Sequence, residues 1–135
     1  MAETPAAVTD THALLFHAAG GGRLGRKAAA HFDACEQRNA ILYVPAVVIW
    51  ESALLARAGR VNLRRSVRGF FDDLFSNPAY QPHHLTAEQV LLGEELRINR
   101  DPFDALICAV AVDLQLPLIT RDADIRGSGR VRAVW

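Results

Sequence analysis

Short apolar runs alternate with stretches of helical periodicity along the chain, and this pattern predicts an α/β protein. The apolar runs predict strands at residues 6–9, 41–44, 78–84, 116–120 and 131–135. The periodic stretches predict a helix that starts near residue 13 and further helices at 24–38, 45–59, 63–75, 86–98 and 102–112. Strands separated by helical segments favour a mostly parallel central sheet, here of about five strands, with helices on both faces.

The helix expected after residue 101 carries the clearest local signal. Asp101 suits the N-cap, Pro102 the first helical position, and Asp104 the first turn, where the helix dipole favours negative charge. The apolar run from Ala105 to Val112 follows and predicts a helix that is buried on most sides. Taken alone, the pattern is explained by a capping-box variant in which Asp104 replaces the usual Glu or Gln.

Four acidic residues stand at positions that a parallel sheet would bring together. Asp10 and Asp122 follow predicted strands, Asp104 starts a helix, and Glu51 lies in the apolar first half of another helix. The carboxyl ends of the strands and the helix starts after them share one edge of such a sheet, so all four groups can meet there. Each also has an ordinary explanation: a cap for Asp10, a turn for Asp122, and a solvated face or a partner for Arg57 in the case of Glu51.

A cluster of carboxylates persists only if its charge is neutralised. Oxygen ligands alone favour Mg²⁺ or Mn²⁺ over zinc, and no Cys–His set in the sequence competes for a metal ion. A carboxylate-bound Mg²⁺ suits phosphate chemistry, because it can bind a phosphoryl oxygen and help to generate hydroxide from water. The sequence therefore favours an enzyme that acts on phosphate esters.

Length and composition fit one folded domain at residues 1–135. Half of the residues are hydrophobic, which is enough for a substantial core. The apolar run at 105–112 is too short to span a membrane, and the first residues lack the pattern of a secretory signal. Cys35 and Cys108 lack metal-ligand spacing, so we expect both to be buried and unpaired. We expect a cytoplasmic protein without a membrane partner.

The basic residues are distributed unevenly, although the net charge is zero. Lys27 is the only lysine among 15 basic residues, so the other 14 are arginine. One block has no acid between its members and suits the backbone of RNA, because arginine binds phosphate in a bidentate manner. This arginine block consists of Arg57, Arg60, Arg64, Arg65 and Arg68. A second stretch holds Arg121, Arg126, Arg130 and Arg132, interrupted by Asp122 and Asp124. A general preference for arginine in the coding sequence explains the composition equally well.

The segment Gly20–Gly25 matches the G-x-G-x-x-G pattern, but we do not expect it to bind a dinucleotide. A helical turn separates it from the preceding strand, and the next strand runs into Pro45 without an acid for a ribose. Arg26 stands where a P-loop requires lysine. We interpret the segment as a flexible loop. His83 and His84 are neighbours on a predicted strand and point to opposite faces, so we expect surface residues there and no metal site.

Four segments together resemble the PIN-domain ribonucleases, and among these the VapC toxins of bacterial type II toxin–antitoxin systems. The segments are Val8-Thr9-Asp10-Thr11-His12, Trp50-Glu51, Arg100-Asp101-Pro102-Phe103-Asp104-Ala105-Leu106-Ile107 and Thr120-Arg121-Asp122-Ala123-Asp124. The resemblance covers nearly the whole chain, with the segments in the order of the family. It implies a PIN-domain fold and cleavage of RNA phosphodiester bonds with Mg²⁺ or Mn²⁺, leaving 3′-OH and 5′-phosphate ends.

The resemblance also implies roles for individual residues. The residues that match the catalytic metal site of the family are Asp10, Glu51, Asp104 and Asp122. Asp124 would be an outer ligand, Asp101 matches a frequent acid of this subgroup, and Thr120 would orient a carboxylate or a water molecule. Relatives often carry arginine after the acid of the central helix, where this chain has Ala105, so a substrate contact there is in doubt. The partners implied are RNA, a cognate VapB-type antitoxin that covers the site, and a second copy of the chain in a homodimer.

Our hypothesis is that the four acids hold one or two Mg²⁺ ions, that a water molecule attacks phosphorus in line, and that the arginine block holds the RNA backbone. One alternative is a catalytically inactive PIN module that binds RNA or protein. Another is a phosphatase or a receiver-type domain, which also places acids around Mg²⁺. A receiver requires a lysine at a late strand end, and Lys27 is the only lysine here.

Overall fold

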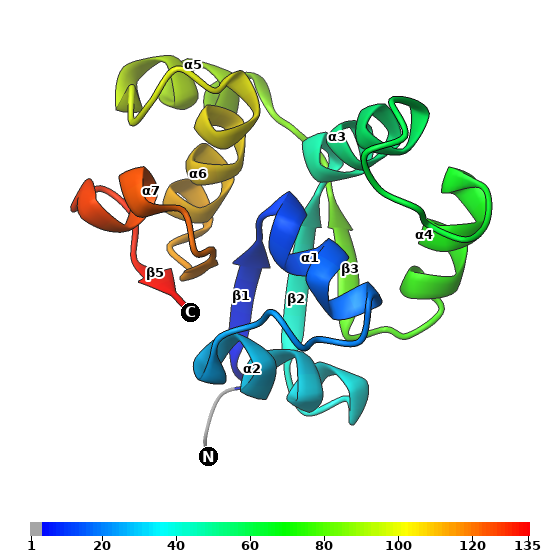
Figure 1. Cartoon of the computed structure of the whole chain (residues 1–135). Coiled ribbons are helices and arrows are strands. Elements are labelled where there is room, and N and C mark those ends of the chain that lie inside the picture. The colour runs from blue at the N-terminus through cyan, green and yellow to red at the C-terminus, as the bar shows by residue number, and fades with distance from the viewer. Residues whose placement is uncertain (1–3) are drawn as a thin grey trace.

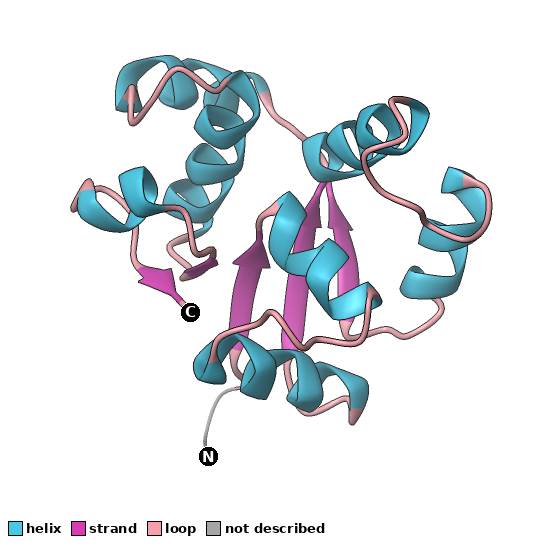
Figure 2. Cartoon of the chain, viewed as in Figure 1, coloured by secondary structure: helices cyan, strands magenta, loops and turns pink. Residues whose placement is uncertain are grey.

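Five parallel strands form the sheet of the computed structural model, which describes residues 4–135 (Figures 1 and 2). The strands are β1 (Ala6–Thr9), β2 (Ile41–Pro45), β3 (Tyr80–His83), β4 (Leu118–Ile119) and β5 (Ala133–Val134). Their order across the sheet is β3-β2-β1-β4-β5, and every neighbouring pair is parallel. The predicted parallel sheet is confirmed.

The connections between the strands are helical throughout the described chain. The helices are α1 (Thr11–Ala18), α2 (Arg26–Glu36), α3 (Ala46–Arg57), α4 (Val67–Phe75), α5 (Ala87–Leu96), α6 (Pro102–Leu114) and α7 (Ala123–Gly127). In Figure 1, α1 and α2 lie in front of β1 and β2, while α5 and α6 pack against each other beyond β1. The predicted α/β class, with helices on both faces of the sheet, is confirmed.

The direction of the chain reverses at the centre of the sheet, between β1 and β4. The first three strands extend outward in the order β1, β2, β3, and the chain then returns to add β4 and β5 on the other side of β1. Val8 of β1 is therefore paired with both Tyr43 of β2 and Leu118 of β4. In parallel sheets the crevice at such a reversal, beyond the carboxyl ends of the strands, is where ligands bind.

The core is anchored by α6, which packs against β1. Residues 107–111 of α6 are completely buried, as are Val8, Leu118 and Ile119 of the adjoining strands. A helix that is apolar almost all round belongs inside a protein, as the sequence predicted for this one. Its burial fixes the N-terminus of α6 relative to the ends of β1 and β4.

Four helices are shorter than predicted, α2, α3, α4 and α5, and the differences in α4 and α5 have a clear local cause. Residues 63–66 are not helical, since Arg64 has a φ of 63°, and α4 begins only after Ser66, whose hydroxyl accepts a hydrogen bond from the Gly69 N–H (3.0 Å). The helix predicted at 86–98 ends at Leu96, because Arg97 adopts the left-handed conformation.

The C-terminal part of the chain differs from the prediction in two respects. The helix α7 was not predicted, because five residues are too few to show helical periodicity. The strands β4 and β5 have two residues each, fewer than the predicted runs at 116–120 and 131–135.

Both cysteines and one of the two neighbouring histidines lie as predicted. Cys35 and Cys108 are buried free thiols, and burial raises the pKa of each to about 12. His84 is exposed, but His83 is half-buried, with a ring nitrogen 3.0 Å from the side-chain nitrogen of Gln89, so the prediction of a surface residue is wrong there. No helix in residues 4–135 is long and apolar enough to span a membrane.

The close approach of Trp135 to Gly25 gives a test of the packing around α2. A Cβ atom on Gly25 would lie 2.3 Å from the backbone oxygen of Trp135, which also accepts a hydrogen bond from the Ala28 N–H (2.9 Å). We expect Gly25→Ala to lower the free energy of unfolding by about 1–3 kcal/mol in urea denaturation.

The matched control is Gly22→Ala in the same loop. Nothing lies within 4 Å of a Cβ atom on Gly22, and its φ is not in the left-handed region. We expect the control to unfold within about 0.5 kcal/mol of the wild type. Equal stabilities of the two variants would contradict the steric explanation.

Candidate active site

Asp10 is a buried carboxylate at the point where β1 ends and α1 begins. It caps α1, because its Oδ1 accepts a hydrogen bond from the Ala13 N–H (2.8 Å), and only 7% of the residue is exposed. The side chain of Thr120, which is fully buried, also hydrogen-bonds the Asp10 carboxylate. Burial raises the pKa of Asp10 although both of these hydrogen bonds favour the charged form.

Asp122 lies across from Asp10, beyond the end of β4. Its own N–H donates to the Thr120 hydroxyl (3.1 Å), and its Oδ1 accepts from the Ile125 N–H (3.0 Å) as the cap of α7. The turn predicted for Asp122 is thus the start of a short helix. One buried hydroxyl group, that of Thr120, connects the two acids that follow the neighbouring strands β1 and β4.

The start of α6 brings two further acids to the same edge. Asp101 is exposed and caps the helix as predicted, accepting hydrogen bonds from the N–H groups of Phe103 (2.8 Å) and Asp104 (3.3 Å). Asp104 is half-buried, and its Oδ2 accepts a hydrogen bond from the side-chain amide of Asn99 (2.9 Å). Burial, with contributions from the charges of Asp101, Asp122 and Asp10, raises the pKa of Asp104 to about 6.

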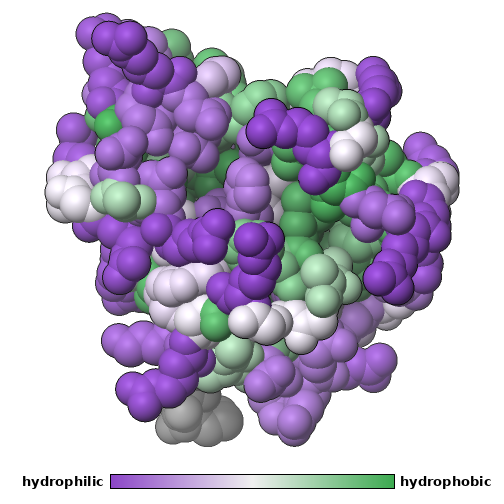
Figure 3. All heavy atoms as spheres, in the orientation of Figure 1, coloured by the Kyte–Doolittle hydropathy of each residue, from purple (hydrophilic) through white to green (hydrophobic). Residues whose placement is uncertain are grey.

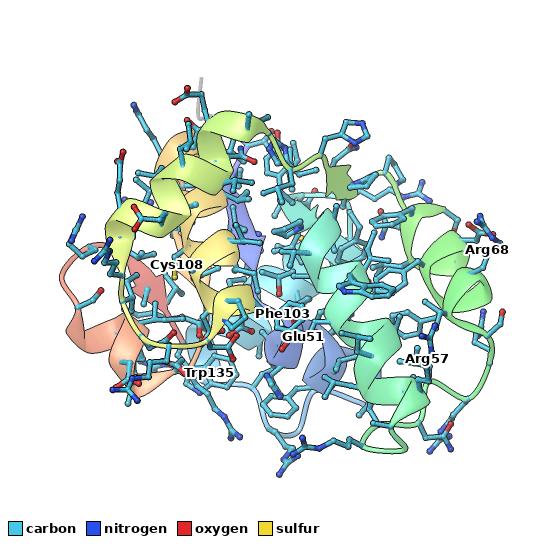
Figure 4. The ribbon with its side chains drawn as sticks, turned by 90° about the horizontal axis from the view of Figure 1, so that it is seen from above. Glu51, Arg57, Arg68, Phe103, Cys108 and Trp135 are labelled. Carbon is cyan, nitrogen blue, oxygen red and sulfur yellow. The ribbon has the colours of Figure 1, made fainter. Side chains whose placement is uncertain are left out.

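Glu51 reaches the edge from the middle of α3. Figure 4 shows it near the centre of the molecule, between α3 and the start of α6. Its Oε1 accepts a hydrogen bond from the Thr11 hydroxyl (2.5 Å), so Glu51 is held by the residue next to Asp10. Its pKa is raised chiefly by burial, then by the charges of Asp101 and Asp10, while the Thr11 hydroxyl and the imidazole of His12 oppose the shift.

The four predicted acids therefore gather in one electrostatic environment. The charges of Asp122 and Asp10 contribute to the raised pKa of Asp104, and the charge of Asp122 contributes to that of Asp10. The charge of Asp10 contributes to the raised pKa of Glu51. Asp124 is exposed in the first turn of α7 and adds its charge near Asp122. These carboxylate oxygens, with the Thr120 hydroxyl nearby, form a donor set that fits a hard divalent cation.

The fit of a metal ion requires some adjustment of the side chains. Within residues 4–135, no three His, Cys, Asp or Glu side chains are already gathered closely enough to hold a metal ion. Asp10 and Asp122 are fixed by backbone N–H groups, whereas Glu51 and Asp104 are each held by one polar side chain. We expect the last two to move when a cation binds.

Three residues near the acids were not identified from the sequence. Thr11 binds Glu51, Asn99 binds Asp104, and the imidazole of His12 acts on both Asp10 and Glu51. Thr11 and His12 directly follow Asp10, and Asn99 lies just before the cap of α6, so proximity in sequence to an acid was the available signal. The partner of Thr11 lies 40 residues away and could not be read from a local pattern.

The predicted RNA-binding arginine block lies away from these acids. Arg64 and Arg65 line a groove of about 480 Å³ beside the C-terminal half of α1, whereas Asp10 caps its N-terminus. An eight-residue helix is about 12 Å long, and Figure 4 places Arg57 and Arg68 toward α4, apart from Glu51. The RNA-binding role of the block, which also includes Arg60, stays a prediction.

Comparisons with known proteins agree with this architecture. A family model for the PIN domain matches residues 7–129. Among solved structures, VapBC2 from Rickettsia felis bound to a DNA fragment from its promoter aligns with a TM-score of 0.69 at 12% identity, covering 96% of this chain and 97% of the other. VapC20 from Mycobacterium tuberculosis, described as a toxin that cleaves the sarcin–ricin loop, gives 0.66 at 16% identity, with coverage of 93% and 98%.

A toxin–antitoxin complex from Klebsiella pneumoniae aligns with a TM-score of 0.62 at 20% identity, covering 96% of both chains. At these identities the likeness is one of fold. No curated protein sequence matches the chain.

The raised pKa of Asp104 predicts a pH dependence of stability in the absence of metal. With a pKa of about 6 in the folded protein and 3.8 as the ordinary value, the fold binds the proton more tightly than the unfolded chain. The resulting stabilisation is complete below the lower value and is lost as the pH rises through the upper one. In EDTA we expect the unfolding free energy of the wild type, relative to Asp104→Asn, to rise by about 1 kcal/mol between about pH 7 and about pH 5.

Urea denaturation at each pH measures this difference. The matched control is Asp72→Asn, which removes an exposed carboxylate on α4. Asp72→Asn should show the same pH dependence of the unfolding free energy as the wild type. A parallel pH profile for wild type and Asp104→Asn would show that Asp104 titrates as an ordinary carboxyl group.

Proposed function

The chain belongs to the PIN-domain family, and from this premise we propose that it is a Mg²⁺-dependent endoribonuclease, the toxin of a type II toxin–antitoxin system. The observation that carries the proposal is the convergence of Asp10, Glu51, Asp104 and Asp122 at the carboxyl ends of β1 and β4. Burial is the main cause of the raised pKa of Asp10, Glu51 and Asp104, and the neighbouring carboxylates add to it. A site whose acids repel one another is suited to bind a cation.

The four acids would hold the cation, with Asp124 as an outer ligand. When bound, a divalent metal ion polarises a phosphoryl oxygen and lowers the pKa of a water molecule. Asp10 provides a rigid position, since the Ala13 N–H and the Thr120 side chain fix its carboxylate. Mn²⁺ suits the same oxygen ligands as Mg²⁺.

Asp104 would bind the cation through Oδ1, because its Oδ2 accepts a hydrogen bond from the Asn99 amide. A carboxylate of the cluster would assist as base when the attacking water loses its proton. In-line attack on phosphorus then expels the 3′-oxygen and leaves 3′-OH and 5′-phosphate ends, as the resemblance to the family implies.

The comparisons support the choice of RNA and of a partner protein. VapC20 is described as cleaving the sarcin–ricin loop, and two other matched structures are described as containing an antitoxin or a VapBC pair. We propose RNA as substrate here and a VapB-type antitoxin as inhibitor.

The groove between α1 and α4 is a suitable surface for an antitoxin segment. Leu14, Leu63, Phe70 and Leu74 give it apolar walls. Charged side chains of both signs also line it, namely Arg64, Arg65, Glu36 and Asp73. Figure 3 shows hydrophobic surface between α1 and α4, bordered by hydrophilic side chains. An amphipathic segment that packs its apolar face into the groove fits this combination.

We propose in addition that the chain forms homodimers. Trp50 on α3 and Leu91 on α5 are large apolar residues that are 52% and 58% exposed. Trp50 also borders an apolar groove lined by Ala46, Val47, Leu85, Pro102, Phe103 and Leu106. A second copy of the chain would cover this surface.

The nuclease proposal is tested with purified protein free of antitoxin and with bulk cellular RNA. We expect cleavage in Mg²⁺, none in EDTA, and a loss of at least about 100-fold in Asp104→Asn, because a metal ligand is removed. Asp72→Asn controls for the loss of a carboxylate and should cleave like the wild type. RNA binding without any metal-dependent cleavage by well-folded protein would instead identify an inactive PIN module.

Metal binding is tested separately from activity by thermal unfolding. We expect Mg²⁺ at about ten times its Kd to raise the Tm of the wild type by about 4–6 °C. Asp104→Asn should respond less, since it lacks both the ligand and the repulsion that the cation relieves. An equal response of the two proteins would place the cation elsewhere.

A further inference from the structure

Two arginines that the proposed mechanism does not use lie on one aromatic ring beside the acids. The guanidinium carbon of Arg23 is 4.8 Å from the centre of the Phe16 ring, and that of Arg121 is 4.7 Å from the same centre. Arg23 comes from the loop between α1 and α2, and Arg121 from the end of β4, so the ring of Phe16 joins two distant segments. Both arginines are exposed, whereas Phe16 is buried.

Neither guanidinium group is neutralised by a carboxylate. The ion pairs among residues 4–135 do not include Arg23 or Arg121, although Arg121 directly precedes Asp122. Stacking on an aromatic ring holds a guanidinium group in place and leaves its N–H groups free. Two such groups stacked on one ring are preorganised to contact an anion with several oxygens.

The position of Phe16 ties this pair to the acidic edge. Phe16 lies on α1, the helix that Asp10 caps, and its ring is 6.2 Å from that of His12, whose charge acts on Asp10 and Glu51. Arg121 stands between Thr120 and Asp122 in the chain. Arg121 is therefore next to an acid of the edge, and the shared ring of Phe16 holds Arg23 close to Arg121.

The glycine-rich loop explains how Arg23 reaches this position. Gly20 and Gly21 have φ angles of 107° and 80°, which other residues rarely adopt, and they turn the chain sharply at the end of α1. The turn brings Arg23 back over Phe16, and the ring of Trp135 also packs on Phe16, with 6.3 Å between the ring centres. The G-x-G-x-x-G pattern thus serves to present an arginine.

We propose that Arg23 and Arg121, held by Phe16, form a phosphate clamp that binds a backbone phosphate of the RNA next to the one that is cleaved. The assignment rests on the proposed ribonuclease function and adds the residues that position the strand. The clamp recognises a phosphodiester and not a base, so it contributes affinity and alignment without sequence preference. Arg23, Arg121 and Phe16 are positioning residues in this scheme.

The test measures binding of a short fluorescein-labelled single-stranded RNA by anisotropy over a range of KCl concentrations, with Mg²⁺ and in the Asp104→Asn background, which prevents cleavage. Replacing both Arg23 and Arg121 by Ala should weaken binding by about tenfold at moderate salt. The slope of log K against log salt should flatten by about 0.7 for each arginine that contacts a phosphate.

The matched control removes two arginines elsewhere. Arg130 and Arg132 are exposed, and the backbone of Arg132 pairs with the amino end of β4, away from the acids. Replacing both by Ala changes the net charge equally and should leave the slope nearly unchanged. Equal effects of the two double variants would overturn the clamp and indicate a diffuse charge effect.

A second variant tests the role of the ring without changing any charge. Phe16→Leu keeps the apolar contact with the core but removes the stacking surface. We expect Phe16→Leu to weaken RNA binding. Arg121→Ala should then reduce the RNA affinity less in the Phe16→Leu protein than in the protein with Phe16, because both changes disrupt the same stacked arrangement. Strictly additive effects would overturn the role of Phe16, and Tm values identify any loss of folding.

The outcomes separate the clamp from the ribonuclease proposal. Metal-dependent cleavage by the wild type, together with unaltered RNA binding by the Arg23 and Arg121 double variant, would overturn the clamp alone. In the active enzyme the same double variant should raise KM with little change in kcat, since the contact is made equally before and during the reaction. If the protein neither binds nor cleaves RNA, both proposals fail.

Discussion

The central constraint of this structure is a buried carboxylate that must remain hydrogen-bonded where β1 ends. Asp10 would be costly to bury without partners, and it obtains them from the first turn of α1 and from Thr120 at the end of β4. The helix and the neighbouring strand are thereby fixed to the same group of atoms. The apolar packing of α6 against β1 then supplies the stability that holds the remaining acids near Asp10 despite their repulsion.

The sequence predicted most of the fold because its signals there are local and periodic. Apolar runs identified β1 and β2, and Asp101 followed by Pro102 identified the start of α6 almost to the residue. The helix α7 and the irregular segment at 63–66 were missed for the opposite reason. A five-residue helix has no periodicity to detect, and the left-handed Arg64 breaks a pattern whose spacing looks helical.

The candidate site, like the fold, could be predicted from the sequence only in part. Its four acids could be selected because each stands at a strand end or a helix start, and parallel topology requires such positions to share an edge. The residues that hold them were harder to select. The partner of Thr11 lies 40 residues away on α3, and the bond from Asn99 to Asp104 depends on the irregular path of the chain before α6. The glycine-rich loop shows the same limit. Its composition predicted a flexible loop, but not that Arg23 of this loop would lie over the ring of Phe16.

The pairing of β1 with β4 also sets when the acidic edge can exist. Thr9 is paired with Ile119, so the two halves of the edge are separated by most of the chain. Proteins are synthesised from the N-terminus, and contacts between distant segments form last. A chain emerging from the ribosome thus contains Asp10, Glu51 and Asp104 before β4 and Asp122, which follows it, have been synthesised. The edge that the four acids share is complete only once translation has passed Asp122.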